Sequence, residues 1–112
     1  MLNFMYKNIN LGVIGIDHGH IFDMLDEMLK EGCSCNYFWT KGDPLTLKEF
    51  NSKYPNIQRK ENKEEILNDS SIDMILISSV PKDRAHNSIE ALKAGKDVMV
   101  DKPGCTTLDQ LN

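Results

Sequence analysis

The chain has 112 residues, of which 40% are hydrophobic and 27% charged, and its formal net charge at pH 7 is -4. This length fits one small α/β domain, and the acidic balance without a cluster of cations argues against a nucleic-acid surface. No apolar run approaches the roughly 20 residues that a membrane span needs, and residues 1–10 lack the pattern of a secretory signal. We therefore expect a cytoplasmic protein that binds neither nucleic acid nor membrane.

The first third of the chain predicts two strands joined by a helix. Residues 11–16 are a continuous apolar run, which is typical of a strand that is buried on both faces. Apolar residues then recur at helical spacing from Ile21 to Leu29, and Gly32 is a natural helix stop. Residues 36–39 predict the second strand.

The middle of the chain predicts a helix, a short strand and a helical turn. Asp43-Pro44 is expected to start the helix, because the Asp side chain caps free amides while Pro takes the first helical position. Pro55 ends this helix, and residues 56–59 and 64–68 predict the strand and the turn. The stretch 59–65 alternates cations with acids, which is typical of a solvated face. The residues expected on the apolar face of the helix are Leu47, Phe50 and Tyr54.

Residues 72–77 form the clearest strand, which we expect to be central in the sheet. Pro81 ends it, a helix follows from about residue 83 to residue 94, and residues 98–100 predict the last strand. Residues 107–110 resemble the capping box of a further helix. The residues expected to face inward from the 83–94 helix are Ala85, Ile89 and Leu92.

This alternation of strands and helices predicts an α/β fold with a doubly wound parallel sheet of the Rossmann type. In such sheets, ligands bind outside the carboxyl ends of the strands, near the point where the winding reverses. Polar side chains of interest gather in the loops that follow four of the predicted strands. These loops are residues 16–17, 39–40, 79–81 and 101–103.

The three cysteines do not form a disulfide framework, because their number is odd and nothing else suggests secretion. Cys33 and Cys35 are two positions apart at a strand start, so their side chains are expected to point the same way. A zinc site needs about four ligands and no second Cys pair exists. We therefore interpret both as small, half-buried thiols, and we assign Cys105 no role.

Four segments in the C-terminal part of the chain resemble a known family. They are Ser78–Pro81, His86, the run Ala91–Val98, and Asp101-Lys102-Pro103. At this spacing they are similar to the glucose–fructose oxidoreductase / inositol dehydrogenase / MocA family, in which a strand ends in a Pro turn, a His lies at the start of the next helix, and "EKP" ends the following strand.

The resemblance implies that residues 1–112 are an NAD(P)-binding Rossmann domain. Intact members carry one more strand and a larger C-terminal domain that holds the substrate, so we expect a sheet truncated before its last strand and a catalytic domain absent from this chain. Either an isolated domain or a shortened gene would explain the length. The implied reaction is hydride transfer between the nicotinamide and a hydroxyl-bearing carbon, as in a sugar or cyclitol, with no turnover by this chain alone.

The same resemblance implies roles for residues near the C-terminus. Lys102 matches the lysine of "EKP", which in the family reaches the nicotinamide ribose and the substrate, so it is the candidate catalytic residue. It lies between Asp101, which shortens the acidic arm of the motif, and the rigid Pro103. These residues, together with Ser79, Pro81 and His86, are the expected cofactor-binding residues of this half of the domain.

The glycine-rich loop departs from the dinucleotide fingerprint. Gly15 fits the first position of the motif, but Asp17 and His20 occupy the second and third positions, which ordinarily hold Gly and a small residue. A carboxylate near two phosphates opposes binding by roughly 1 kcal/mol or more, whereas the amides at the start of the next helix favour an anion. The expected cofactor-binding residues of this loop are Gly15, Ile16, Asp17 and His18, with His20 as a second imidazole that could donate to a phosphate.

Two other interpretations of this loop remain open. Asp17, His18 and His20 have the side chains of a metal site, but the positive end of a helix dipole opposes a cation, and we predict no metal. In the second interpretation, Asp17 caps the helix and the histidines are merely polar.

The end of the second strand carries Thr40 and Lys41 where an acid would bind the ribose hydroxyls of NAD. A hydroxyl and a cation tolerate a 2′-phosphate, so the predicted cofactor is NAD or NADP, with NADP slightly favoured. The alternative function is a non-enzymatic scaffold or interaction module that has lost dinucleotide binding through Asp17. A sheet edge left beside the last strand would also favour pairing of two copies into a homodimer.

Overall fold

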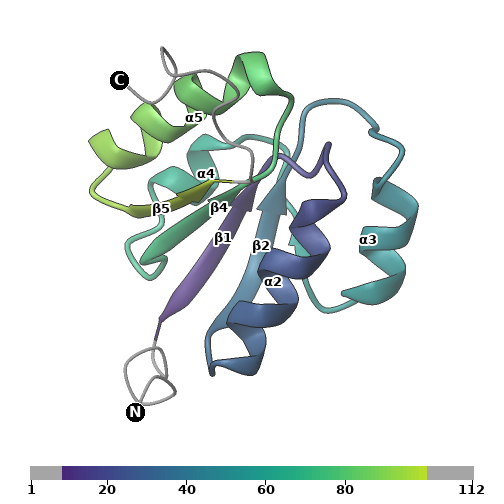
Figure 1. Cartoon of the computed structure of the whole chain (residues 1–112). Helices are drawn as coiled ribbons and strands as arrows, with labels where there is room; N and C mark the ends of the chain where they lie inside the picture. The colour runs from purple at the N-terminus through teal and green to yellow at the C-terminus, as the bar shows by residue number, and fades with distance from the viewer. Residues whose placement is uncertain (1–8, 101–112) are drawn as a thin grey trace.

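The structure is a computed structural model, and it describes residues 9–100 of the chain. Its centre is a five-stranded sheet in the order β3-β2-β1-β4-β5, and every neighbouring pair of strands is parallel (Figure 1). The winding therefore reverses between β1 and β4, as the predicted fold requires. The strands are β1 (Asn10–Ile14), β2 (Ser34–Trp39), β3 (Gln58–Arg59), β4 (Met74–Ile77) and β5 (Asp97–Val100).

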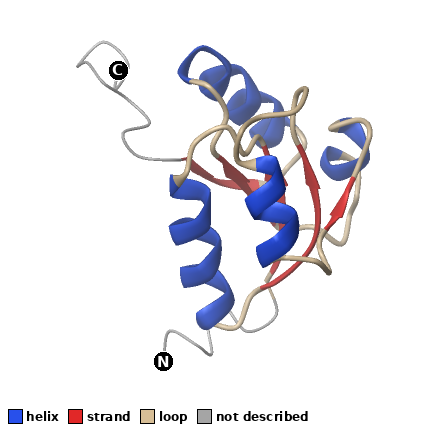
Figure 2. Ribbon diagram, turned by 90° about the vertical axis from the view of Figure 1, so that its right-hand side faces the viewer, coloured by secondary structure: helices blue, strands red, loops and turns tan. Residues whose placement is uncertain are grey.

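Helices cover both faces of the sheet (Figures 1 and 2). Buried side chains of α2 and α3 belong to one hydrophobic cluster, and those of α4 and α5 belong to a second cluster. The Rossmann-type α/β prediction is confirmed. The helices are α2 (His20–Lys30), α3 (Leu47–Lys53), α4 (Glu64–Leu67) and α5 (Pro81–Lys93). No helix within residues 9–100 combines the length and apolarity needed to cross a membrane.

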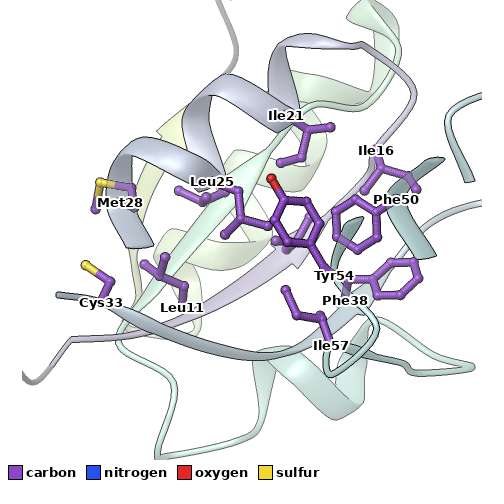
Figure 3. Close-up of a cluster of buried hydrophobic side chains, with 12 residues drawn as sticks. Leu11, Ile16, Ile21, Leu25, Met28, Cys33, Phe38, Phe50, Tyr54 and Ile57 are labelled. Atoms are coloured by element: carbon purple, nitrogen blue, oxygen red, sulfur yellow. The ribbon is translucent and has the colours of Figure 1, made fainter. Parts of the chain in front are cut away.

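The cluster beneath α2 and α3 is the larger of the two (Figure 3). Ile21, Leu25 and Met28 are buried on one side of α2, which confirms the predicted helical spacing. On α3, the Phe50 ring centroid lies 4.5 Å from that of Phe38 on β2. Burial of each such side chain contributes about 1.5–3 kcal/mol, so α2 and α3 are fixed firmly against the sheet.

The central strands supply both clusters by alternation. Val13 and Leu76 face α2 and α3, whereas Ile14, Ile75 and Ile77 face α4 and α5. This arrangement explains the continuous apolar runs of β1 and β4, because a strand that is covered on both faces has no polar side.

The two described cysteines lie at the edge of the first cluster. Cys33 is buried, and Cys35 is partly buried against the cluster. The interpretation as half-buried thiols is confirmed for Cys35, whereas Cys33 is more deeply buried than predicted. Burial raises the pKa of the Cys35 thiol to about 12, so it is protonated at neutral pH.

The predicted inward face of α5 was wrong. Ala85 is exposed, and Ile89 and Leu92 are 52% and 60% exposed. The side chains that face the sheet instead are those that form hydrogen bonds with the loop after β4. These hydrogen bonds determine how α5 is rotated about its own axis. The buried residues of α5 are Arg84, Asn87 and Ala91.

Two predicted helix starts were also displaced. Pro81 is the first residue of α5 rather than the end of the strand, since a proline fits the first helical position, where no N–H bond is required. Thr46 precedes α3, so Asp43 does not cap that helix. The Asp43 carboxylate instead lies 3.2 Å from the guanidinium of Arg59.

Candidate functional site

A cleft with a volume of about 310 Å³ lies at the carboxyl ends of β1, β2 and β4. This strand-end cleft spans the point where the winding reverses. Three of the four loops singled out from the sequence meet there, and the fourth, residues 101–103, lies outside the described residues. The residues that line the cleft are Gly15, Asp17, Trp39, Lys41, Lys63, Ser79, Asp83, His86 and Asn87.

Gly15 forms the tight turn that was predicted for the first position of the motif. Its φ is +88°, and a Cβ there would lie 2.5 Å from the Ser79 Cβ and 2.8 Å from the Ser79 Cα. Its N–H donates to the Trp39 carbonyl at 2.7 Å, and its carbonyl accepts from the Ser78 N–H at 3.2 Å. Only glycine fits between β2 and β4 here.

Ile16 and Thr40 lie beneath the cleft rather than in its lining. Ile16 is fully buried, its N–H donates to the Thr40 hydroxyl at 3.3 Å, and its carbonyl accepts from the Thr46 hydroxyl. Thr40 is only 2% exposed, so its hydroxyl supports the loop after β1. Of the two candidates at the end of β2, Lys41 is therefore the one that lines the cleft.

Asp17 joins two loops of the site. Its carboxylate accepts a hydrogen bond from the backbone N–H of Val80, immediately before α5. The N-cap of α2 is Gly19, which has no side-chain cap, so the interpretation of Asp17 as the cap of α2 is wrong. Burial raises the pKa of Asp17, although its backbone hydrogen bonds and the charge of Lys41 oppose that shift.

The two histidines flank the start of α2. The His18 N–H donates to the Ser78 carbonyl at 3.0 Å, and the His18 and His20 ring centroids are 4.3 Å apart. A Cβ at Gly19 would have no atom within 4 Å, so space is open beside the backbone at the positive end of this helix. Residues 9–100 contain no group of three His, Cys, Asp or Glu side chains placed to hold a metal ion.

A polar network forms the α5 side of the cleft. Asn87 is 4% exposed, and its amide donates to the Ser79 hydroxyl at 3.0 Å and accepts from Lys63 Nζ at 3.3 Å. Lys63 Nζ also lies 2.6 Å from a Glu90 carboxylate oxygen and 5.5 Å from the centroid of the Trp39 ring. The charge of Lys63 is therefore already compensated within the protein.

His86 and Pro81 lie nearer the surface. The His86 side chain is 68% exposed, with Nε2 3.2 Å from a Glu90 carboxylate oxygen, so it forms part of the rim. Pro81 starts α5 but does not line the cleft. The predicted site residues Asp101, Lys102 and Pro103 lie outside the described residues.

Comparison with known proteins agrees with this geometry. Residues 9–112 match the sequence model of the glucose–fructose oxidoreductase / inositol dehydrogenase / MocA family, described as an oxidoreductase family with an NAD-binding Rossmann fold. The chain belongs to this family. It is an NAD(P)-binding Rossmann domain of the oxidoreductase type.

Several solved structures resemble this family member. A putative oxidoreductase from Erwinia carotovora atroseptica is 33% identical with a TM-score of 0.83, and the match covers 92% of this chain and 31% of that one. Biliverdin reductase from Synechocystis, in complex with biliverdin and NADP+, is 19% identical with a TM-score of 0.71, covering 92% and 32%. A putative NADPH-dependent oxidoreductase from Desulfitobacterium hafniense is 21% identical with a TM-score of 0.75, covering 95% and 30%.

The chain thus spans about a third of the length of these solved relatives. The two structures below 25% identity show the fold alone. The comparison with curated proteins found no match.

The donors and open space of the site fit the dinucleotide of the family. The Gly15 backbone reaches the cleft with no side chain in the way, and the start of α2 presents the positive end of a helix dipole to an anion. Lys41 is exposed and makes no ion pair or hydrogen bond with residues 9–100, so its charge remains available to a phosphate.

Sequence reasoning missed the roles of Arg59, Lys63 and Asn87. The charge alternation of residues 59–65 was interpreted as a solvated face, yet Arg59 bonds the loop after β2 and Lys63 lines the cleft. Their positions depend on β3 pairing with β2 and on the rotation of α5. The sequence carries no local signal for either relationship.

Proposed function

We propose that this domain binds the cofactor of a two-domain oxidoreductase that moves a hydride between the nicotinamide and a hydroxyl-bearing carbon, as in a sugar or cyclitol. Membership of the family supports the reaction type, and the resemblance to the family supplies the substrate class. In this proposal residues 1–112 are the NAD(P)-binding domain, and a separate domain holds the substrate. The coverage of about a third of the solved relatives is consistent with that division.

The observation that carries the proposal is the strand-end cleft at the point where the winding reverses. We assign the pyrophosphate to the loop from Gly15 to His18, and the adenosine ribose to Lys41. When bound, the nicotinamide supplies or accepts the hydride, while residues of the chain bind and orient it. The remaining proposed cofactor-binding residues are Ser79, Pro81, His86, Asp101, Lys102 and Pro103, with Lys102 also the catalytic residue.

We favour NADP over NAD because of the charge at the end of β2. Lys41 occupies the position where an acid would bind the ribose hydroxyls of NAD, and its ammonium lines the cleft without a hydrogen bond or ion pair to residues 9–100. Two structural relatives have NADP+ or NADPH in their descriptions, which accords with this preference.

The test is titration of the chain with NADPH and with NADH, followed by calorimetry and by tryptophan fluorescence. Trp39 is the sole tryptophan and lines the cleft, so its emission reports occupancy directly. We expect both cofactors to bind, with NADPH tighter, and Lys41→Ala to remove most of the difference. Absence of binding by either cofactor would contradict the proposal and favour the scaffold alternative.

Assembly is a separate proposal. β5 is an edge strand of the described sheet, and an edge strand presents backbone groups that can pair with a second chain. We propose a homodimer through this edge. Light scattering over a range of concentrations tests it, and a strict monomer would contradict it.

A further inference from the structure

Arg59 links the edge strand β3 to the loop that follows β2. One nitrogen of its guanidinium, Nη2, donates to the Thr40 carbonyl at 3.1 Å and also to the Gly42 carbonyl. The other, Nη1, lies 3.2 Å from the Asp43 carboxylate. The two carbonyls belong to the residues on either side of Lys41, so one side chain holds the backbone of Lys41 from both directions.

The loop needs such support. Gly42 has a φ of +63°, and a Cβ placed there would have no atom within 4 Å, so local packing does little to restrict it. Glycine in open space loses more conformational freedom on ordering than other residues. The bonds from Arg59 therefore supply an ordering contact that the rest of the loop lacks.

The ion pair between Arg59 and Asp43 has an electrostatic consequence. Both side chains are substantially exposed, at 37% and 83%, so the pair itself adds little stability. The pair does, however, place the Arg59 guanidinium against the Asp43 carboxylate, two residues from Lys41. Without the guanidinium, the uncompensated Asp43 carboxylate would compete for the Lys41 ammonium and repel an incoming phosphate.

We propose that Arg59 is a positioning residue for cofactor choice: it fixes the loop Thr40–Asp43 so that Lys41 faces the 2′-phosphate of NADP. This inference rests on the proposed dinucleotide function of the strand-end cleft. Arg59 acts through Lys41 and through compensation of Asp43, not by contact with the phosphate. Lysine cannot replace it, since a single ammonium lacks the planar array of donors that bonds both carbonyls and the carboxylate.

The test measures NADPH and NADH affinity for Arg59→Ala, Arg59→Lys and a matched control, Lys60→Ala. Lys60 is the next residue, and its ammonium lies 4.2 Å from the Tyr37 ring centroid and makes no hydrogen bond or ion pair with residues 40–43. Both alanine variants thus remove one positive charge from the same sheet edge. We expect both Arg59 variants to weaken NADPH binding about tenfold while NADH changes less than about twofold, and Lys60→Ala to change neither by more than about twofold.

A double-mutant cycle separates the mechanisms. In a Lys41→Ala background, Arg59→Ala should reduce NADPH affinity no further, because the residue that it positions is gone. Hydrogen exchange without cofactor provides a second readout: the amides of residues 41 and 42 should exchange faster in Arg59→Ala than in the Lys60→Ala control.

The outcomes that would overturn the inference can be distinguished from failure of the proposed function. Equal losses for NADH and NADPH would indicate a general structural role and overturn the inference, and so would an additive effect in the Lys41→Ala background. If the wild-type chain binds NADPH while Arg59→Ala leaves selectivity and exchange unchanged, the inference fails and the proposed function stands. If the wild-type chain binds neither cofactor, the proposed function fails and the inference fails with it.

Discussion

The carboxylate of Asp17 accepts a hydrogen bond from the backbone N–H of Val80, which ties the loop after β1 to the start of α5. Asp17 occupies the position where the dinucleotide fingerprint has its second glycine. Its side chain therefore has a structural partner and also lines the cleft. Asp17 therefore connects two loops of the site, and its negative charge also repels a phosphate.

The first prediction concerns the pH dependence of cofactor affinity. Burial raises the pKa of Asp17, so a growing fraction of its carboxyl is neutral as the pH falls toward that raised value. Loss of the negative charge favours the pyrophosphate, and NADPH affinity should therefore rise as the pH is lowered from 7 toward that raised pKa. Asp17→Asn should bind NADPH about fivefold more tightly at pH 7 and should show a flatter profile, measured by calorimetry.

The variant provides the internal comparison for this prediction. Every other titratable group, His18, His20 and His86 included, is the same in both proteins. The difference between the two profiles therefore isolates Asp17. Identical profiles for wild type and Asp17→Asn would show that this carboxylate does not affect the bound phosphates.

The second prediction compares two glycines of the same loop. Gly15→Ala places a methyl group 2.5 Å from the Ser79 Cβ at a φ of +88°, and should reduce the free energy of unfolding by about 2–4 kcal/mol. Gly19→Ala enters open space at a φ of -62°, and should change it by less than about 1 kcal/mol. Urea unfolding measures both. Similar losses in the free energy of unfolding for the two variants would mean that the carboxyl ends of β1 and β4 move apart easily.

Most of the fold could be predicted because its signals are local. The runs at β1 and β4 are apolar throughout since both faces of these strands are covered, and Ile21, Leu25 and Met28 follow the helical period. The inward face of α5 could not be predicted from apolar spacing. Hydrogen bonds from Asn87 and its neighbours to the loop after β4 set that rotation, and they exist only in the folded chain.

The site was predictable only in part, for the same reason. Gly15 carries its own signal, because a glycine between a buried strand and a helix marks a tight turn. The choice between Thr40 and Lys41 had no such signal: the two are adjacent, and only the bond from Ile16 to the Thr40 hydroxyl shows which one turns inward. Arg59 lies 16 positions from Asp43 in sequence, and β-sheet pairing alone brings them together.

The third prediction concerns acid stability at the junction of α2 and α3. Two hydrogen bonds to the Asp26 carboxylate lower its pKa. The one from Lys53 has the larger effect, and the one from the Tyr54 hydroxyl, at 2.6 Å, has the smaller. Because the pKa of Asp26 is lower in the folded than in the unfolded protein, the ionised carboxylate stabilises the fold at pH values above the unfolded-state pKa of about 3.9. This contribution is lost as the pH falls through the folded-state pKa. Asp26→Asn should therefore be less stable by about 1 kcal/mol at pH 7, with a difference that shrinks below about pH 4.

Urea unfolding at several pH values tests this prediction, with Asp23→Asn as the control. Asp23 lies on the same helix and makes no hydrogen bond or ion pair with the described residues, so its substitution should cost less than about 0.5 kcal/mol. If the free energies of unfolding of wild type and Asp26→Asn differed by the same amount at all pH values, the lowered pKa of Asp26 would be contradicted.

The fourth prediction compares Asn87 with its neighbour His86 on α5. Asn87 is buried between the Ser79 hydroxyl and Lys63. Asn87→Ala removes the donor to the Ser79 hydroxyl and one of the two acceptors that Lys63 has among residues 9–100, and should reduce stability by about 1–3 kcal/mol. The His86 side chain is 68% exposed, and His86→Ala should change stability by less than about 0.5 kcal/mol.

Cofactor titration adds a second readout to this comparison. Asn87 holds Ser79 and Lys63 at the α5 side of the cleft and makes no side-chain hydrogen bond to the loop that carries Lys41 within residues 9–100. Its loss should therefore weaken NADPH and NADH by the same factor, in contrast to the selective effect expected of Arg59→Ala. A selective loss of NADPH in Asn87→Ala would mean instead that the α5 wall, rather than the loop after β2, recognises the 2′-phosphate.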